Sequence, residues 1–339
     1  MSAVAGDLSG PGRLARLVHS VSTTRHGLIG LSVVRVAIGS VILLDLMIHA
    51  ADRQVLWGPR GWYDTTRMER DQQLGASLFN LGDSAWLTDV LYLTYGAVAL
   101  AFLMGWRTRV TTPALLLMVW TFQERNPYLI NGGDNLVRIV LLYLVFAQVD
   151  AHLVRRRQAP RGAAAPGSAR AVWATVAHNA ALAACIGQLC VVYLASAMFK
   201  IQGEMWQEGT AVYYITRVAE YNAWPEVSHW FAQSAVLVTA ATYGTVLLQL
   251  SFTFTLLTTW ARHLVFVGLA ASHVGIGVLM GLPVFSLFMI AIDLLVFTDA
   301  EWRRGRARLL HATERLRARL PSRGSAAPPT LHPIPRGAR

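Results

Sequence analysis

Residues 171–200 read AVWATVAHNAALAACIGQLCVVYLASAMFK. Lys200, the last residue, is the only Asp, Glu, Lys or Arg in this stretch, and most of the others are Ala, Val, Leu or Ile. About 20 apolar residues are enough to cross the hydrocarbon core of a bilayer as an α-helix. The stretch is therefore predicted to be a membrane-spanning helix that ends at a lysine.

The chain as a whole has the same apolar character. Of its 339 residues, 54% are hydrophobic and only 14% are charged, whereas a typical soluble domain has about 25% charged residues. This composition excludes a purely cytosolic enzyme, a disordered chain and a secreted domain stabilised by disulfides. We predict an all-α integral membrane protein, a polytopic helical bundle whose first partner is the lipid bilayer.

Further apolar stretches on both sides of residues 171–200 predict about eight transmembrane helices. They lie near residues 27–50, 86–106, 110–124, 135–150, 171–200, 236–258, 263–282 and 284–299. Because the third and the last are short, seven spans or a re-entrant segment also fit. Residues 201–235 are too polar to span and are rich in Trp and Tyr, which suits the membrane interface.

The net charge of +11 is distributed as in a membrane protein. Basic residues gather in alternate loops and at both ends, which by the positive-inside rule places these segments and both termini in the cytoplasm. We predict a basic N-terminal segment (1–26), a transmembrane domain (27–299) and a basic, partly disordered tail (300–339). Within the transmembrane domain, a Pro/Ala/Gly-rich linker (158–169) leads to the span at 171–200. No nucleic-acid partner is predicted, and the expected location is the plasma membrane, with multiple passes.

Ionisable side chains inside the predicted spans mark candidate functional residues, because such groups are costly in lipid and usually face a partner or a cavity. They are Arg35, Asp45, His49, Arg138, His178, Lys200, His273 and Asp293. Asp45 and His49 are four residues apart and share one helix face. The alternative is that these residues pair with one another and only hold the bundle together.

Lys200 is the one lysine of the chain. An amine removed from water can become neutral and act as a base or nucleophile near pH 7. The alternative is a lysine that snorkels to the interface and pairs with Glu204. His273, near the middle of its span, is either a proton carrier or a histidine bonded to a backbone carbonyl.

The segment Glu124–Asp134 reads ERNPYLINGGD and joins two predicted spans. Its Asn-Pro and Asn-Gly-Gly sequences are typical of turns, and its polar side chains also suit a binding cleft. Cys185 and Cys190 are expected to be free thiols, because five residues separate them on one helix. No metal site is predicted.

Several segments resemble the horizontally transferred transmembrane (HTTM) domain family, which is related to the membrane part of the vitamin K-dependent gamma-carboxylases. The first contains Arg35, Asp45, Asp52 and Gly58–Asp64. The second contains Arg125-Asn126-Pro127, Asn131-Gly132-Gly133-Asp134 and Arg138. The third contains Tyr193–Lys200, Trp206, Glu208 and Gly209, and the block around His273 up to Ser286 resembles a later carboxylase helix.

The resemblance implies that Lys200 is the catalytic lysine, acting with His273. In the carboxylases this amine deprotonates vitamin K hydroquinone, whose reaction with oxygen then drives carboxylation of a peptide glutamate. A vitamin K-type quinol such as menaquinol and an exported peptide are thus implied. The implied substrate or pocket residues are Asp45, His49, Arg125, Asn126, Asn131, Asp134, Arg138, Tyr193, Trp206 and Glu208. One departure is that Gly132, Gly133 and Asp134 stand where the carboxylases have a histidine.

Two functions follow from these observations. The first is a carboxylase-like enzyme that uses a quinol to modify an exported peptide. The second, which short bacterial members of the family suggest, is a non-catalytic membrane partner in the maturation, export or immunity of a secreted peptide toxin. It would dock through the outward loops 51–85 and 201–235. Their tryptophans include Trp57, Trp62, Trp206, Trp224 and Trp230. A small-molecule transporter fits less well, because the sequence shows no internal repeat.

Overall fold

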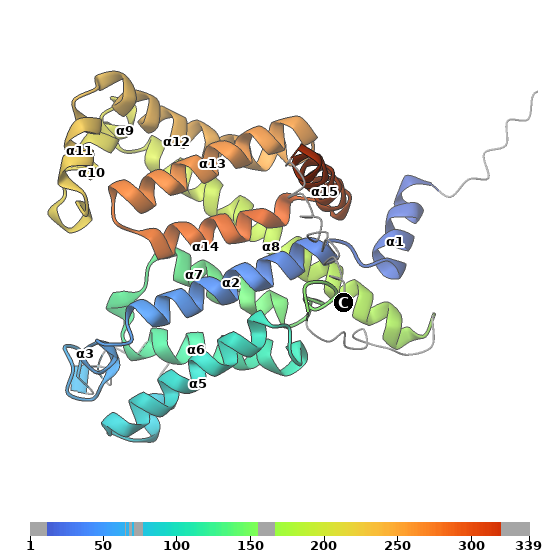
Figure 1. Ribbon diagram of the computed structural model, residues 1–339, viewed down its shortest axis with the longest axis horizontal. Helices are drawn as coiled ribbons and strands as arrows, with labels where there is room; N and C mark the ends of the chain where they lie inside the picture. The colour runs from blue at the N-terminus through green and yellow to red at the C-terminus, as the bar shows by residue number, and fades with distance from the viewer. Residues whose placement is uncertain (1–11, 65, 68–69, 71–76, 155–166, 320–339) are drawn as a thin grey trace, which may run out of the picture. The chain divides into compact units, whose positions relative to one another are not determined.

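The computed structural model describes residues 12–64, 66–67, 70, 77–154 and 167–319, and within these residues it is helical without strands (Figure 1). The all-α prediction is confirmed for this part of the chain. The chain divides into two compact units, Met1–Asp299 and Ala300–Arg339. Residues 1–11, most of the predicted linker and the end of the predicted tail lie outside the described residues.

Five helices are long and apolar enough to cross a membrane by length and composition. They are α2 (Leu28–Ile48), α5 (Ala85–Leu103), α8 (Ala169–Ile201), α12 (Ala235–Thr255) and α13 (Thr259–Leu279). Each coincides with a predicted span to within a few residues. The apolar stretch 171–200 lies within α8, which is 33 residues long. The structure therefore supports a membrane-spanning protein, with five candidate spans.

The other three predicted spans correspond to helices that are shorter or less apolar. They are α6 (Thr108–Arg125), α7 (Gly132–Leu144) and α14 (Pro283–Asp293), which continues as the 3-10 turn η4 (Leu294–Val296). The 13 residues of α7 rise about 20 Å as a helix, less than the roughly 30 Å of a hydrocarbon core. The last turn of α6 is polar, because it contains Gln123, Glu124 and Arg125.

Three candidate spans begin at a serine that accepts a hydrogen bond from the first helical turn. Ser84 precedes α5, Ser168 precedes α8 and Ser234 precedes α12, and their hydroxyls accept from the N–H groups of Leu87, Ala171 and Leu237. Such caps satisfy N–H groups that have no partner within the helix. The serines thus define where the apolar stretches become helical.

The helices of the first unit form a chain of pairwise contacts. Helix α2 packs against α5, α5 against α6, and α8 against α12, which in turn packs against α13. Helix α14 contacts α13, α2 and α7, so it joins the two groups of helices, as Figure 1 shows. This position brings residues of α14 to both groups.

Short helices connect the longer ones. They are α1 (Arg13–Thr23), α3 (Arg53–Trp57), η1 (Leu78–Leu81), η2 (Pro127–Leu129), α9 (Glu204–Gln207), α10 (Ala211–Ile215), η3 (Ala219–Tyr221) and α11 (Pro225–Ala232). Residues 201–235, which the sequence indicates are too polar to span, form four of these short helices. Helix α15 (Asp299–Arg319) supplies the described part of the second unit.

Arg35 is completely buried in α2 and contacts backbone carbonyls rather than a carboxylate. Its guanidinium donates to the carbonyl oxygens of Phe102 (2.7 Å), Leu103, Val149 (3.0 Å) and Leu153 (2.6 Å). Phe102 and Leu103 are the last residues of α5, whose terminal carbonyls have no partner within the helix. Arg35 therefore holds the end of α5, through carbonyls rather than through another ionisable residue of the predicted spans.

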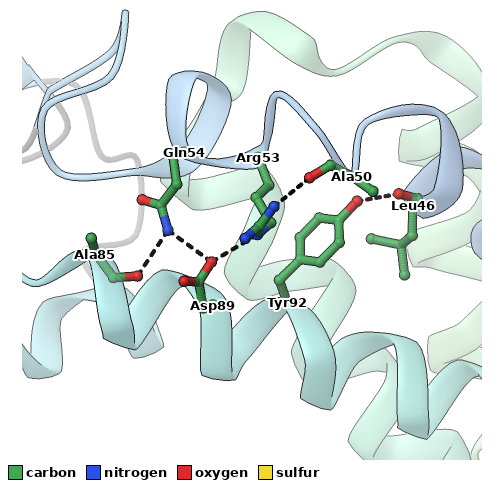
Figure 2. A network of polar contacts seen from close by, with 7 residues as sticks. All are labelled: Leu46, Ala50, Arg53, Gln54, Ala85, Asp89 and Tyr92. Carbon is green, nitrogen blue, oxygen red and sulfur yellow. Dashed lines mark hydrogen bonds and ion pairs between the residues drawn. The ribbon is translucent and has the colours of Figure 1, made fainter.

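A polar network fixes the segment that follows α2 against the start of α5 (Figure 2). Arg53 donates to Asp89 (2.7 Å) and to the Ala50 carbonyl (2.7 Å). Gln54 donates to the same carboxylate oxygen (2.8 Å), and the Tyr92 hydroxyl donates to the Leu46 carbonyl. The network thereby sets the position of the last turn of α2, which contains Asp45 and is followed by His49.

Candidate functional site

A cavity of about 740 Å³ lies among α8, α12, α13 and α14 and the short helices after α8. We call it the lysine cavity, because Lys200 lines it. Most of its wall is apolar or aromatic, and its polar side chains are few. They include Tyr193, Ser196, Lys200, Thr216, Thr245, Gln249, Ser272 and His273. An apolar cavity of this size with a few polar groups is typical of a small-molecule site.

Lys200 lies in the last turn of α8, and its amine has two close contacts. Nζ donates a hydrogen bond to the Ser196 hydroxyl (3.4 Å) and lies 5.2 Å from the centroid of the Trp206 ring. Lys200 and Glu204 are both described, and the structure shows no ion pair between them. The amine is therefore held by a hydroxyl and an aromatic face, with no carboxylate neutralising it.

Tyr193, His273 and Asp293 form a buried polar group beside this amine. The Tyr193 hydroxyl donates to Asp293 Oδ2 (2.7 Å) and lies 3.2 Å from His273 Nε2. Since the hydroxyl hydrogen is directed to Asp293, the geometry favours the His273 tautomer in which Nε2–H donates to the tyrosine oxygen. His273 is thus bonded to a side chain rather than to a backbone carbonyl.

Several buried polar atoms near the cavity have no hydrogen-bond partner among the described residues. They include His273 Nδ1, Asp293 Oδ1 and Gln249 Oε1. Leaving a buried polar atom unsatisfied is costly, so each such atom needs an explanation. Two of these side chains, His273 and Gln249, line the lysine cavity. A ligand with hydroxyl groups could satisfy them.

The candidate site contains two residues that the sequence analysis did not assign to it. The sequence marks Asp293 only as an ionisable residue of the last predicted span, because it is a carboxylate within an apolar stretch. Gln249 was not singled out, although an amide inside the apolar stretch 236–258 is a comparable signal. Neither residue could be placed near Lys200 without knowing how α12, α14 and α8 pack.

A second cavity, of about 370 Å³, lies at the end of α2 beside α5, α6 and α7. We call it the acidic cavity. Of the predicted site residues, Asp45, His49, Asn126, Asn131 and Asp134 line it. Asp45 and His49 form an ion pair (3.2 Å) when the histidine is protonated, as their spacing predicts. Asn131 and Asp134 form a capping box at the start of α7.

Nine of the twelve predicted site residues are therefore divided between two cavities. Tyr193, Lys200, Trp206 and His273 line the lysine cavity. Asn131 lines both, together with Ile130, Leu282 and Phe285. The two cavities thus share a wall made of the loop before α7 and the start of α14.

Two titratable groups of the acidic cavity lie outside the five candidate spans. Just after α2, the side-chain hydrogen bond to Asp45 raises the pKa of His49, although burial opposes it. At the start of α7, burial raises the pKa of Asp134 to about 6, although a backbone hydrogen bond from Asn131 opposes it. The charge of this cavity therefore depends on pH in the physiological range.

Three predicted site residues line neither cavity. Arg125 is buried and donates to the carbonyls of Tyr63 (2.8 Å) and Gly58 (2.5 Å), so it holds the loop after α3. Arg138 donates to Asn135 (3.0 Å) and lies over the Trp120 ring. Glu208 is exposed. Asn126, which lines the acidic cavity, also donates to the Leu56 carbonyl (2.9 Å).

No family model, no curated protein and no solved structure matches the chain. The resemblance to the HTTM family therefore rests on residues of this chain alone. In the structure, residues of the HTTM-like segments line the two cavities, and Arg125 holds the loop after α3. The two cavities are the features of the structure that support a function.

Proposed function

We propose that the protein is an integral membrane enzyme similar to the vitamin K-dependent gamma-carboxylases. In this proposal Lys200 acts as a base on a quinol in the lysine cavity, and the reaction modifies an exported peptide. One observation carries it: the single lysine of the chain lines a cavity of about 740 Å³, and its amine forms no ion pair with a carboxylate of the described residues. A menaquinol-type compound is the proposed co-substrate.

The residues of the lysine cavity suit a quinol. The aromatic rings of Trp206, Phe285 and Tyr221 and many aliphatic side chains line it, so a flat apolar ring system would be buried favourably. The unpartnered His273 Nδ1 and Gln249 Oε1 are acceptors, and each could accept a hydrogen bond from a quinol hydroxyl.

Each side chain near the amine has a role in moving one proton. The neutral Lys200 amine accepts the proton of a phenolic hydroxyl, which leaves a phenolate and an ammonium. The face of Trp206 then stabilises the ammonium through a cation–π interaction, and the Ser196 hydroxyl accepts a hydrogen bond from it. Bound quinol supplies the reducing equivalents and, with oxygen, the strong base needed to deprotonate a peptide glutamate.

The proposal includes the finer membrane topology. Helices α6, α7 and α14 with their neighbouring residues would complete about eight spans. The arginine-rich segments would lie in the cytoplasm together with both termini, in the plasma membrane. Lys200 would then be at the outer end of α8, where a quinol from the bilayer and a peptide from outside can meet.

Filling the lysine cavity should prevent quinol binding. Gly275 lines the cavity, and a Cβ added there meets no atom within 4 Å, so Gly275→Phe would place its ring in the cavity without a backbone clash. We expect the Kd for menadiol, measured by tryptophan fluorescence quenching in nanodiscs, to rise at least about tenfold because the ring excludes the ligand.

The matched control is Gly187→Phe in α8. Gly187 also has open space around its Cβ position and does not line the lysine cavity. This variant should bind menadiol within about twofold of the unsubstituted protein. Equal affinity in both variants, or no binding by the unsubstituted protein, would contradict a quinol site in this cavity.

The second candidate function is a non-catalytic membrane partner for a secreted peptide, and exposed aromatic side chains favour it. Trp62, Trp224 and Trp230 are about 60% exposed or more in the predicted outward loops (59%, 60% and 65%). Trp57 is buried and Trp206 lines the lysine cavity, so neither belongs to such a surface. If loop substitutions abolish the cellular function and Lys200→Ala preserves it, this candidate replaces the enzyme.

A further inference from the structure

The acidic cavity has a negative charge balance. The carboxylates of Asp45 and Asp134 line it, and no lysine or arginine is among the described residues of its wall. His49 is the basic group there, and it pairs with Asp45 at 3.2 Å. At least one carboxylate therefore has no basic side chain opposite it within the cavity.

The wall around these carboxylates is aromatic. Trp57, Tyr95, Phe122, Phe285 and Phe288 all line the cavity. The ring centroids of Tyr95 and Phe122 are 5.0 Å apart, and those of Trp57 and Phe122 are 5.4 Å apart. Aromatic faces attract cations, and carboxylates reinforce that attraction.

Gln123 provides a third and independent feature. It is only 8% exposed, lines the cavity, and its Oε1 has no hydrogen-bond partner among the residues that the structure describes. Its Nε2 donates to the Asp134 carbonyl (3.0 Å), which fixes the amide so that the oxygen is the free end. A buried acceptor without a donor indicates that a donor is supplied from outside the chain.

We infer that the acidic cavity binds an organic ammonium group. The –NH₃⁺ of such a ligand has three donors and no acceptor, which matches Gln123 Oε1 and the carboxylates of Asp45 and Asp134, while the aromatic wall takes the alkyl chain. The described residues contain no group of three or more His, Cys, Asp or Glu side chains that could hold a metal ion. The amine belongs to a small soluble molecule or to a lipid headgroup.

Binding should become tighter as the pH rises from 5 to 8. Burial raises the pKa of Asp134 to about 6, so its carboxylate gains its charge in this range. His49, whose pKa is raised chiefly by its hydrogen bond to Asp45, can only lose positive charge as the pH rises, so it acts in the same direction. Asp45 and Tyr95 are the other titratable groups of the wall, and deprotonation of any of these groups makes the cavity more negative.

The test uses n-butylammonium as the probe and the full chain in phosphatidylglycerol nanodiscs. Its Kd is measured by saturation-transfer-difference NMR, with n-butanol as the neutral analogue. We expect the ammonium to bind, butanol not to bind, and Asp134→Asn and Asp45→Asn each to weaken binding by about tenfold, because a hydrogen bond to a charged group is replaced by a neutral one.

The control variant is Asp83→Asn, whose carboxylate is exposed and does not line the cavity. It should bind the probe like the unsubstituted protein. Asp134→Asn retains an oxygen that can accept the Asn131 N–H, so the capping box persists and a folding failure is not expected. Equal binding by Asp134→Asn and the unsubstituted protein, or equal binding of butanol, would overturn the inference.

The site is separate from the proposed quinol chemistry, and the same experiment distinguishes the two. Lys200→Ala should leave probe binding unchanged, because Lys200 does not line the acidic cavity. Adding phosphatidylethanolamine to the nanodiscs identifies the source of the amine. Loss of the probe signal assigns the site to a lipid headgroup, and retention assigns it to a soluble amine.

Discussion

Lys200→Arg is expected to lose quinol-dependent turnover by about 10²- to 10⁴-fold, the range typical of removing a general base. A guanidinium retains its proton at any workable pH, so the variant keeps a cation in place but cannot accept a phenolic proton. The rate of menaquinol-dependent oxygen uptake by the purified protein in nanodiscs is the measurement. Because arginine also interacts favourably with an aromatic face, the contact with Trp206 (5.2 Å from Nζ) should be preserved.

The control for this variant is Glu204→Gln. Glu204 is exposed and forms no ion pair with Lys200 in the structure, so its neutral analogue should turn over at the rate of the unsubstituted protein. If Lys200→Arg is fully active, the amine is not the base. If Glu204→Gln fails as Lys200→Arg does, Lys200 depends on an ion pair at the interface and the proposed role of its free amine is wrong.

Arg35→Met is expected to destabilise the protein by several kcal/mol, because each buried acceptor left without its donor costs about 1–3 kcal/mol. The substitution leaves carbonyls of Phe102, Val149 and Leu153, among others, without their donor in the interior. It also removes the cap from the end of α5. Thermal unfolding of the protein in nanodiscs should show a large decrease in Tm or a protein that does not accumulate.

Arg138→Met is the matched control for Arg35→Met. Arg138 is partly exposed, and its contacts are one hydrogen bond to Asn135 and the ring of Trp120, so its loss should cost no more than about 1 kcal/mol. A Tm for Arg35→Met close to that of Arg138→Met would show that the buried guanidinium does not hold α5 in place.

The apolar stretches predict the candidate spans well, because hydropathy over about 20 residues is a local property. Helices α2, α5, α8, α12 and α13 begin and end within a few residues of the predicted limits. The other predicted spans correspond to helices that are too short or too polar to be candidate spans by themselves. In α6, for example, polar residues such as Gln123 lower the mean hydropathy of the helix, although the fold buries them inside the protein.

The partners of buried polar residues could not be predicted from the sequence. Arg35 contacts carbonyls at 102–103, 149 and 153, positions that only the packing of α2, α5 and the end of α7 brings together. In the same way, Tyr193 donates a hydrogen bond to Asp293, which lies 100 residues further along the chain. The resemblance presents the site residues as one set, whereas the structure divides nine of them between two cavities with a common wall and places three outside both.

The most direct test of the account is whether the lysine cavity holds a quinone. The protein is purified in nanodiscs that contain menaquinone and is analysed by native mass spectrometry beside Lys200→Ala. The account predicts a bound naphthoquinone in the unsubstituted protein that is lost or strongly depleted in the variant. No bound quinone in the unsubstituted protein, or equal occupancy in both, would contradict a quinol site at Lys200.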